Sequence, residues 1–298
     1  MSTTTSTTTS TTGPALAAEG LPDVTGVLGG GRMGSGIAHA LLLAGTRVLV
    51  AESSAERADL ARAAVEKAVR ASAERGADLD VDAVLARLEV GIGPGSLRPA
   101  GLVVEAVPED PALKADVLAG LDAALGPGAV LASNTSSLSI GELSTVLSAD
   151  RPFLGLHFFN PVPASTLVEV VVGPGTPPGL VDRARGWVEQ MGKTAVVVRD
   201  SPGFASSRLG VALGLEAVRM VAEGVASPED IDAAMTLGYK HPVGPLRLTD
   251  IVGLDVRLGI AEHLERTLGP RFAPPELLRE KVSRGELGRK SGQGFYTW

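Results

Sequence analysis

The chain has 298 residues, of which 44% are hydrophobic and 3% aromatic, so it is long enough for two domains with cores of Ala, Val, Leu and Ile. A net charge of −7 argues against a nucleic-acid partner, and the lack of cysteine excludes disulfides, a cysteine nucleophile and cysteine-based metal sites. No apolar run approaches the length of about 18 residues that a membrane-spanning helix needs, and no metal-ligand spacing is visible.

The chain begins with a low-complexity run, MSTTTSTTTSTT. Its Ser/Thr composition predicts a disordered tail over residues 1–20. The run has neither the basic region nor the apolar region of a signal peptide. Together with the lack of cysteine, this favours a cytoplasmic location.

Alternating strands and helices then follow. Apolar runs at Val24 to Leu28 and Arg47 to Ala51 predict two buried strands, and Met33 to Leu43 between them has helical character. Further strands are expected at Leu102 to Val107, Ala129 to Ala132, Phe153 to Phe158, Leu167 to Val172 and Thr194 to Val198. Further helices are expected at Ser54 to Ala73, Asp82 to Leu88, Pro111 to Leu125 and Val181 to Met191. The alternation predicts an α/β domain over residues 21–199, with a Rossmann-type, doubly wound, mostly parallel sheet.

The pattern changes at Asp200-Ser201-Pro202-Gly203, and no convincing strand follows before the last few residues. Apolar residues at helical spacing continue from Leu209 to Val221. A helix start at Ser227-Pro228, one helical stretch from Leu246 to Leu268 and another from Pro275 to Val282 complete the pattern. We therefore expect an all-helical C-terminal domain over residues 200–298.

A glycine fingerprint lies between the first strand and the first helix. Gly29-Gly30-Gly31-Arg32-Met33-Gly34 matches G-x-G-x-x-G, in which Gly29 allows the tight turn, Gly31 lets the backbone approach a pyrophosphate, and Gly34 allows close helix–strand packing. The amino end of a helix is a ready anion site. Because the motif follows a strand and opens a helix, it indicates a dinucleotide cofactor.

An acidic residue indicates which dinucleotide binds. Glu52 lies at the end of the second strand, 23 residues after Gly29. An acid there bonds the ribose hydroxyls and repels a 2′-phosphate, which favours NAD over NADP. Arg57 lies close by and keeps NADP open.

His157 and Glu169 are twelve residues apart, on the two strands expected at Phe153 to Phe158 and Leu167 to Val172. An imidazole can take a proton from an alcohol near neutral pH. A carboxylate held against its other nitrogen fixes the tautomer and stabilises the imidazolium. Next to a dinucleotide fingerprint, this pair indicates alcohol oxidation or carbonyl reduction with hydride transfer.

Several segments together resemble one family. They are GGGRMGSGIA, SNTSSLSI, GLHFFNPV, LVEVV, DSPGF, HPVGPLRLTDIVGLD and KSGQGFYTW. In order and spacing, over about residues 22 to 298, they are similar to the L-3-hydroxyacyl-CoA dehydrogenases of the 3-hydroxybutyryl-CoA dehydrogenase type. The resemblance implies a homodimer that uses NAD to oxidise an (S)-3-hydroxyacyl-CoA of short chain to the 3-oxoacyl-CoA, reversibly.

The same resemblance implies residue roles. It assigns general acid/base catalysis to His157, its orientation to Glu169, and a hydrogen bond with the substrate oxygen to Ser136. It also assigns cofactor contacts to Glu109, Lys114, Asn160 and Lys290, with Lys114 touching CoA as well.

One departure from the family pattern concerns substrate binding. Where the family has Asn before the Arg of the helix after PGF, this chain has Ser207 before Arg208. Serine keeps a donor but has a shorter reach, and one donor to an oxyanion can be worth about 3 kcal/mol. Ser207 therefore keeps one alternative open, the same chemistry on L-gulonate or on a hydroxyacyl group bound to a carrier protein. A dinucleotide-binding protein without turnover is the other alternative, and the presence of His157, Glu169 and Ser136 together argues against it.

Overall fold

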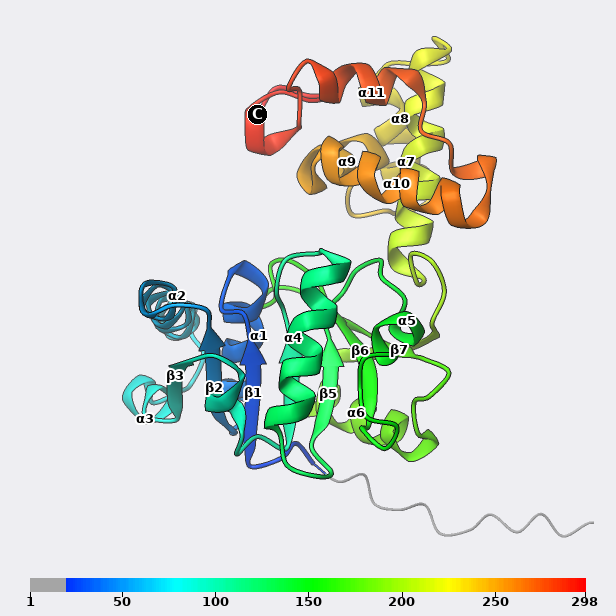
Figure 1. The fold of residues 1–298 in the computed structure, drawn as a ribbon. Helices are drawn as coiled ribbons and strands as arrows, with labels where there is room; N and C mark the ends of the chain where they lie inside the picture. Colours follow the sequence, from blue (N-terminus) through cyan, green and yellow to red (C-terminus); the bar gives the residue numbers. More distant parts are fainter. Residues whose placement is uncertain (1–19) are drawn as a thin grey trace, which may run out of the picture.

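The computed structural model describes residues 20–298 and has two parts (Figure 1): a sheet flanked by helices, and a group of helices that follows it in the chain. The tail expected over residues 1–20 lies outside the described residues, apart from Gly20. Within residues 20–298, no helix is both long and apolar enough to cross a membrane.

The sheet has eight strands in the order β3-β2-β1-β4-β5-β6-β7-β8. Their bounds are β1 Val24–Leu28, β2 Arg47–Glu52, β3 Leu88–Ile92, β4 Leu102–Glu105, β5 Val130–Ser133, β6 Phe153–Phe158, β7 Leu167–Val172 and β8 Thr194–Arg199. The pairs from β3 to β6 are all parallel, β7 is antiparallel to β6, and β8 is parallel to β7. The expected Rossmann-type, mostly parallel sheet is thus confirmed. Its strand order reverses between β1 and β4, where open α/β sheets bind ligands at the carboxyl ends of the strands.

Helices cover both faces of the sheet, because its central strands are apolar on both sides. One core cluster joins the sheet to α1 (Arg32–Leu43), α2 (Ala55–Glu74) and α6 (Pro178–Gln190), and includes the fully buried Trp187. The opposite cluster joins it to α4 (Pro111–Ala124) and α5 (Ile140–Ser144). Phe204, from the segment after β8, also packs in this second cluster and anchors the connection to the helical part.

The second part has its own core. It contains α7 (Ser206–Ala222), α8 (Pro228–Ala233), the short π-helix Ala234–Gly238, α9 (Pro245–Val252), α10 (Leu254–Leu268) and α11 (Glu276–Ser283). Near its end the chain makes only isolated β-bridges, such as Gly288 with Gln293. Buried Asp250 accepts hydrogen bonds from the main-chain N–H groups of Phe295 and Tyr296 and holds this last segment on the helices.

Two expectations were wrong in detail. The segment expected to be helical from Asp82 to Leu88 is the short helix α3 (Val81–Leu85) followed by the start of strand β3, which the sequence reading missed. The single helical stretch expected from Leu246 to Leu268 is broken at Gly253, whose φ of 108° is not helical. The apolar spacing continues across this break, so periodicity alone did not reveal it.

Candidate active site

The glycine turn between β1 and α1 has the shape that a pyrophosphate needs. Gly29 has a φ of 92°, and a Cβ on Gly34 would fall 1.7 Å from the carbonyl oxygen of Gly29. A Cβ on Gly31 would meet nothing within 4 Å. Gly31 is also the N-cap of α1, with no side-chain cap and no acid in the first turn. The amino end of α1 therefore has room beside Gly31 and no side chain that caps its first N–H groups, and the turn fits the diphosphate of a dinucleotide.

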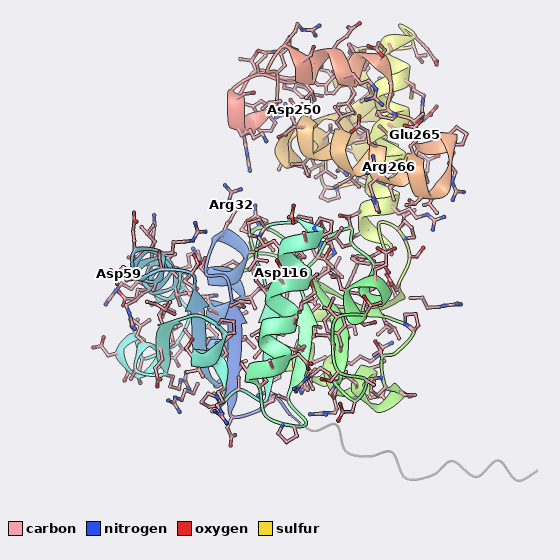
Figure 2. The ribbon with its side chains drawn as sticks, in the orientation of Figure 1. Arg32, Asp59, Asp116, Asp250, Glu265 and Arg266 are labelled. Atoms are coloured by element: carbon pink, nitrogen blue, oxygen red, sulfur yellow. The ribbon has the colours of Figure 1, made fainter. Side chains whose placement is uncertain are left out.

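Glu52 lies beside this turn at the carboxyl end of β2. Its Oε1 accepts a hydrogen bond from the Gly30 N–H at 2.7 Å, and its Oε2 pairs with Nε of Arg57 at 3.2 Å. Arg57 is thus bound to the carboxylate that would select against a 2′-phosphate. Arg32, the first residue of α1, is exposed and points toward the helical part (Figure 2), whereas Met33 is half-buried against the core.

His157 and Glu169 are direct partners across the antiparallel strands β6 and β7. Such partners have their side chains on the same face of a sheet. His157 Nδ1 lies 2.8 Å from Glu169 Oε2, and both side chains are buried. In the tautomer whose Nδ1–H donates to the carboxylate, Nε2 carries the free lone pair of the ring.

Glu169 is held from a second side by the start of α7. Its Oε1 accepts hydrogen bonds from the N–H groups of Ala205 (3.2 Å) and Ser206 (2.8 Å), and its Oε2 accepts one from the Ser206 hydroxyl (2.8 Å). Burial alone would raise the pKa of Glu169, but the hydrogen bonds from His157 and Ser206 outweigh it and hold the pKa below the ordinary glutamate value. Glu169 is therefore an anion at neutral pH.

Two aromatic rings flank the imidazole. The ring centroids of Phe159 and His157 are 4.4 Å apart, and those of Phe204 and His157 are 5.8 Å apart. These apolar neighbours limit water around the pair, so that its hydrogen bonds act at a low local dielectric.

The turn after β5, which contains Ser136, is organised by Glu109. One carboxylate oxygen of Glu109 accepts hydrogen bonds from the Ser136 N–H (2.8 Å), the Ser136 hydroxyl (3.1 Å) and the Thr135 hydroxyl (2.7 Å). Burial acts to raise the pKa of Glu109, yet Lys114 and these hydrogen bonds bring it below the usual range. Asn134 Oδ1 accepts the N–H of Phe158 at 2.8 Å and so links this turn to the residue after His157.

Lys114 on α4 is buried under the same turn. Its Nζ lies 2.6 Å from Glu105 Oε1 and 3.4 Å from Glu109 Oε2. Glu105, which is fully buried, also accepts a hydrogen bond from the Ser133 hydroxyl at 2.6 Å. Only 1% of the Lys114 side chain is exposed, so its ammonium supports the two carboxylates rather than standing free at the surface.

Within residues 20–298, three other expected site residues have no recorded hydrogen bond with His157 or Glu169. Asn160 is exposed after β6, and Lys290 lies in the helical part, where its Nζ pairs with Asp255 at 2.5 Å. Ser207 is half-buried in the first turn of α7, next to Ser206. No feature of the sequence favoured Ser206 over Ser207. The bond from Ser206 to Glu169 depends on how β7 packs against the start of α7.

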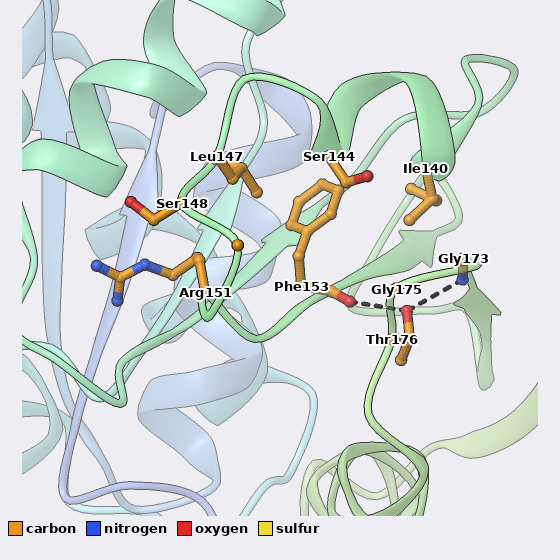
Figure 3. A pocket seen from close by; sticks show the side chains of 10 residues that line it. Ile140, Ser144, Leu147, Ser148, Arg151, Phe153, Gly173, Gly175 and Thr176 are labelled. Carbon is orange, nitrogen blue, oxygen red and sulfur yellow. Dashed lines mark hydrogen bonds between the residues drawn. The ribbon is translucent and has the colours of Figure 1, made fainter.

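A cavity of about 160 Å³ lies near the amino end of β6 (Figure 3). Its polar side chains already have partners: the Thr176 hydroxyl donates to the Phe153 carbonyl (2.8 Å) and accepts from the Gly173 N–H (3.0 Å). Ser148 and Arg151 both donate to Asp122. His157 lies four residues beyond Phe153, roughly 13 Å along the strand. This cavity is therefore separate from the His157 pair. Among residues 20–298, no group of three or more His, Asp or Glu side chains could hold a metal ion.

The fold, the glycine turn and the paired histidine and carboxylate together fit one class of protein: an oxidoreductase that binds a dinucleotide. Residues 24–201 match the model of the 3-hydroxyacyl-CoA dehydrogenase NAD binding domain, and residues 203–298 match that of its C-terminal domain. The chain therefore belongs to the 3-hydroxyacyl-CoA dehydrogenase family and is an NAD-dependent oxidoreductase.

Individual relatives agree over nearly the whole chain. A probable 3-hydroxybutyryl-CoA dehydrogenase of Bacillus subtilis is 41% identical, over 91% of this chain and 96% of the relative. The structure of Mycobacterium tuberculosis FadB2 superposes with a TM-score of 0.88 and 40% identity, over 93% of this chain and 99% of that chain. The structure of (S)-3-hydroxybutyryl-CoA dehydrogenase PaaH1 from Ralstonia eutropha also has a TM-score of 0.88, with 36% identity and the same coverage.

Proposed function

We propose that this chain catalyses the reversible, NAD-dependent oxidation of a short-chain (S)-3-hydroxyacyl-CoA, such as 3-hydroxybutanoyl-CoA, to the 3-oxoacyl-CoA. The observation that carries this proposal is the contact of 2.8 Å between His157 and Glu169 in a family member with an open glycine turn. The short acyl chain is supported by the names of the relatives.

In the oxidation, Nε2 of His157 accepts the proton of the 3-hydroxyl group. Glu169 holds the opposite nitrogen, so the tautomer is correct before the substrate arrives, and its negative charge stabilises the imidazolium afterwards. NAD, when bound, supplies the hydride acceptor. In the reduction, the same imidazolium returns the proton to the carbonyl oxygen.

Ser136 is proposed to hydrogen-bond the substrate oxygen. Its main-chain N–H stays on Glu109 and fixes the turn, whereas its hydroxyl can rotate from Glu109 to the substrate because hydroxyl hydrogens turn freely. Ser207, at the start of α7, is the second proposed substrate contact. Its shorter reach than asparagine is expected to weaken binding of the carbonyl rather than proton transfer.

The cofactor contacts are proposed on the same basis. The open N–H groups from Gly31 onward and the exposed Arg32 suit the diphosphate, and Glu52 suits the ribose hydroxyls. Glu109, Lys114, Asn160 and Lys290 are assigned to the cofactor by the resemblance, and Lys114 also to CoA. In this structure Lys114 and Lys290 are each paired with a carboxylate, so a direct contact would require these ion pairs to rearrange.

We further propose that residues 21–199 bind the cofactor and that residues 200–298 complete the substrate site and form a homodimer. The helical part exposes large apolar side chains, which are costly to leave in water. Among them are Leu209, Leu237, Tyr239, Val252 and Val256, with exposures from 39% to 76%. Light scattering should give twice the chain mass. The cytoplasmic location stays a prediction that cell fractionation can test.

NADH absorbance tests the activity. With acetoacetyl-CoA, NADH should be consumed rapidly and NADPH slowly; with L-gulonate and NAD, no NADH should form. Turnover with the sugar acid alone would establish the alternative substrate, and NADH binding without turnover would establish a binding protein. Replacement of His157 (His157→Ala) should abolish turnover and leave NADH affinity nearly unchanged. Turnover that survives this change would show that the assigned base is wrong.

A further inference from the structure

Helix α7 lacks a cap of its own. Its N-cap residue is Ala205, which has no side chain that could accept a hydrogen bond from the first turn. The first N–H groups of a helix need partners from elsewhere. Glu169 on β7 supplies one, because its Oε1 accepts the N–H groups of both Ala205 and Ser206. The positive end of the helix dipole also favours a carboxylate there.

The Ser206 hydroxyl binds the other oxygen of Glu169. This oxygen, Oε2, lies 2.8 Å from the Ser206 Oγ and 2.8 Å from His157 Nδ1. Only 1% of Glu169 is exposed, so water is excluded from this carboxylate. Two side-chain donors therefore share one oxygen, and a change in one of them must alter how the carboxylate acts on the other.

We propose that Ser206 is a positioning residue that sets the pH range in which the His157–Glu169 pair is active. The proposal rests on the proposed function of His157 as general base. The hydroxyl offsets part of the negative charge on Oε2, so the carboxylate favours the imidazolium less than it would alone. The neutral imidazole, which the oxidation requires, then forms at a lower pH.

Charged groups on the neighbouring elements bind other partners. Arg208 on α7 contacts Ser201, Glu109 contacts the Ser136 turn, and Asp200 after β8 contacts Ser139 and the Gly141 N–H. Within residues 20–298, the polar groups recorded on Glu169 are His157 and the first residues of α7. Ser206 is thus the hydroxyl in position to adjust this carboxylate.

The pH profile of kcat/KM for the oxidation tests this idea. In wild type, kcat/KM should rise with pH as the base loses its proton. Ser206→Ala should move this acidic limb to higher pH by roughly half to one unit, with little change in the KM for NAD. Ser206→Thr keeps the hydroxyl and should restore the wild-type limb, and Ser206→Cys, with a weaker donor, should lie between them.

Ser207→Ala is the matched control. It removes the neighbouring hydroxyl, which has no recorded hydrogen bond with Glu169. It should change the KM for the acyl-CoA and leave the limb in place. A Ser206→Ala limb within 0.2 pH unit of wild type, or an equal shift in Ser207→Ala, would overturn the proposal about Ser206. An inactive wild type, or an active His157→Ala variant, would instead refute the proposed function. Melting temperature and NADH binding show that each variant is folded.

Discussion

Replacing Glu169 by glutamine tests the geometry of the His157 pair most directly. In the wild type, all groups around this carboxylate are donors: two main-chain N–H groups on Oε1, and His157 and the Ser206 hydroxyl on Oε2. A carboxamide has nearly the same shape, but its nitrogen cannot accept a hydrogen bond. In either orientation, the amide NH₂ of Glu169→Gln therefore faces two donors.

The main-chain N–H groups cannot turn away, so we expect the amide oxygen to take their side. The NH₂ group then faces His157 and stabilises the tautomer with the proton on Nε2, where the base needs its lone pair. The negative charge that stabilises the imidazolium is lost as well. A comparable change in serine proteases lowers kcat by about 10⁴. We expect a fall in kcat of about 10³ to 10⁴, or about 4 to 5 kcal/mol in the activation free energy.

Initial rates of NADH formation at saturating substrate measure this change, and NADH fluorescence and thermal melting show whether the variant binds cofactor and folds. Glu89→Gln is the matched control. It removes the same charge from an exposed ion pair with Arg47, remote from the proposed chemistry, and should leave kcat unchanged. A Glu169→Gln variant that retains more than a tenth of the wild-type kcat would refute the role assigned to the carboxylate.

Two further predictions concern the cofactor turn and the pH dependence of stability. Gly34→Ala places a Cβ 1.7 Å from the Gly29 carbonyl oxygen, so NADH titration should give a Kd at least tenfold higher than that of wild type. Gly179→Ala, whose Cβ would lie in open space, is the control and should leave the Kd unchanged. Equal affinities of the two variants would contradict the close packing at Gly34. Burial, with Arg75 and Lys193 nearby, lowers the pKa of His39 from 6.5 to about 4. As the pH falls from 6.5 to about 4, the unfolded chain therefore binds a proton at this histidine that the folded chain does not bind. The folded state loses stability over this pH range. After allowance for solvent screening, this loss in the free energy of unfolding is about 2 kcal/mol. Urea unfolding at pH 7 and pH 4.5 should show the loss in wild type but not in His39→Leu. An equal loss in the variant would show that His39 is not the cause.

The sequence predicted those strands and helices that are buried in the core, because burial leaves a clear apolar pattern in the sequence. Strand β4 is fully buried, and its first three residues, Leu102-Val103-Val104, read as an apolar run. Strand β3 was missed because it is a short edge strand, Leu-Glu-Val-Gly-Ile, in which a glycine and a charged residue interrupt the apolar pattern. Its pairing with β2 is what defines it as a strand. The break at Gly253 was missed because it lies in the backbone angles and leaves the apolar spacing intact.

In the site, residue types that carry chemistry could be recognised, but their supporting contacts could not. His157 and Glu169 stand out by type and setting, and the glycine turn stands out by spacing. The hydrogen bonds from Ser206 to Glu169 span 37 residues, and that from Ser133 to Glu105 spans 28. Each depends on how the helical part or a neighbouring strand packs, which local patterns do not encode.

The cross-strand register of β6 and β7 has a consequence for how such enzymes can diverge. His157 and Glu169 meet because their strands pair directly, and this register does not depend on how many residues separate the strands. Insertions or deletions after Asn160 in the loop between the strands would change the sequence spacing of twelve residues and leave the cross-strand register of the pair intact. Deletion of one residue within β7 would instead turn Glu169 to the other face of the sheet. A search for related proteins by the fixed spacing would therefore miss any member with a changed loop, which a search by strand pairing would retain.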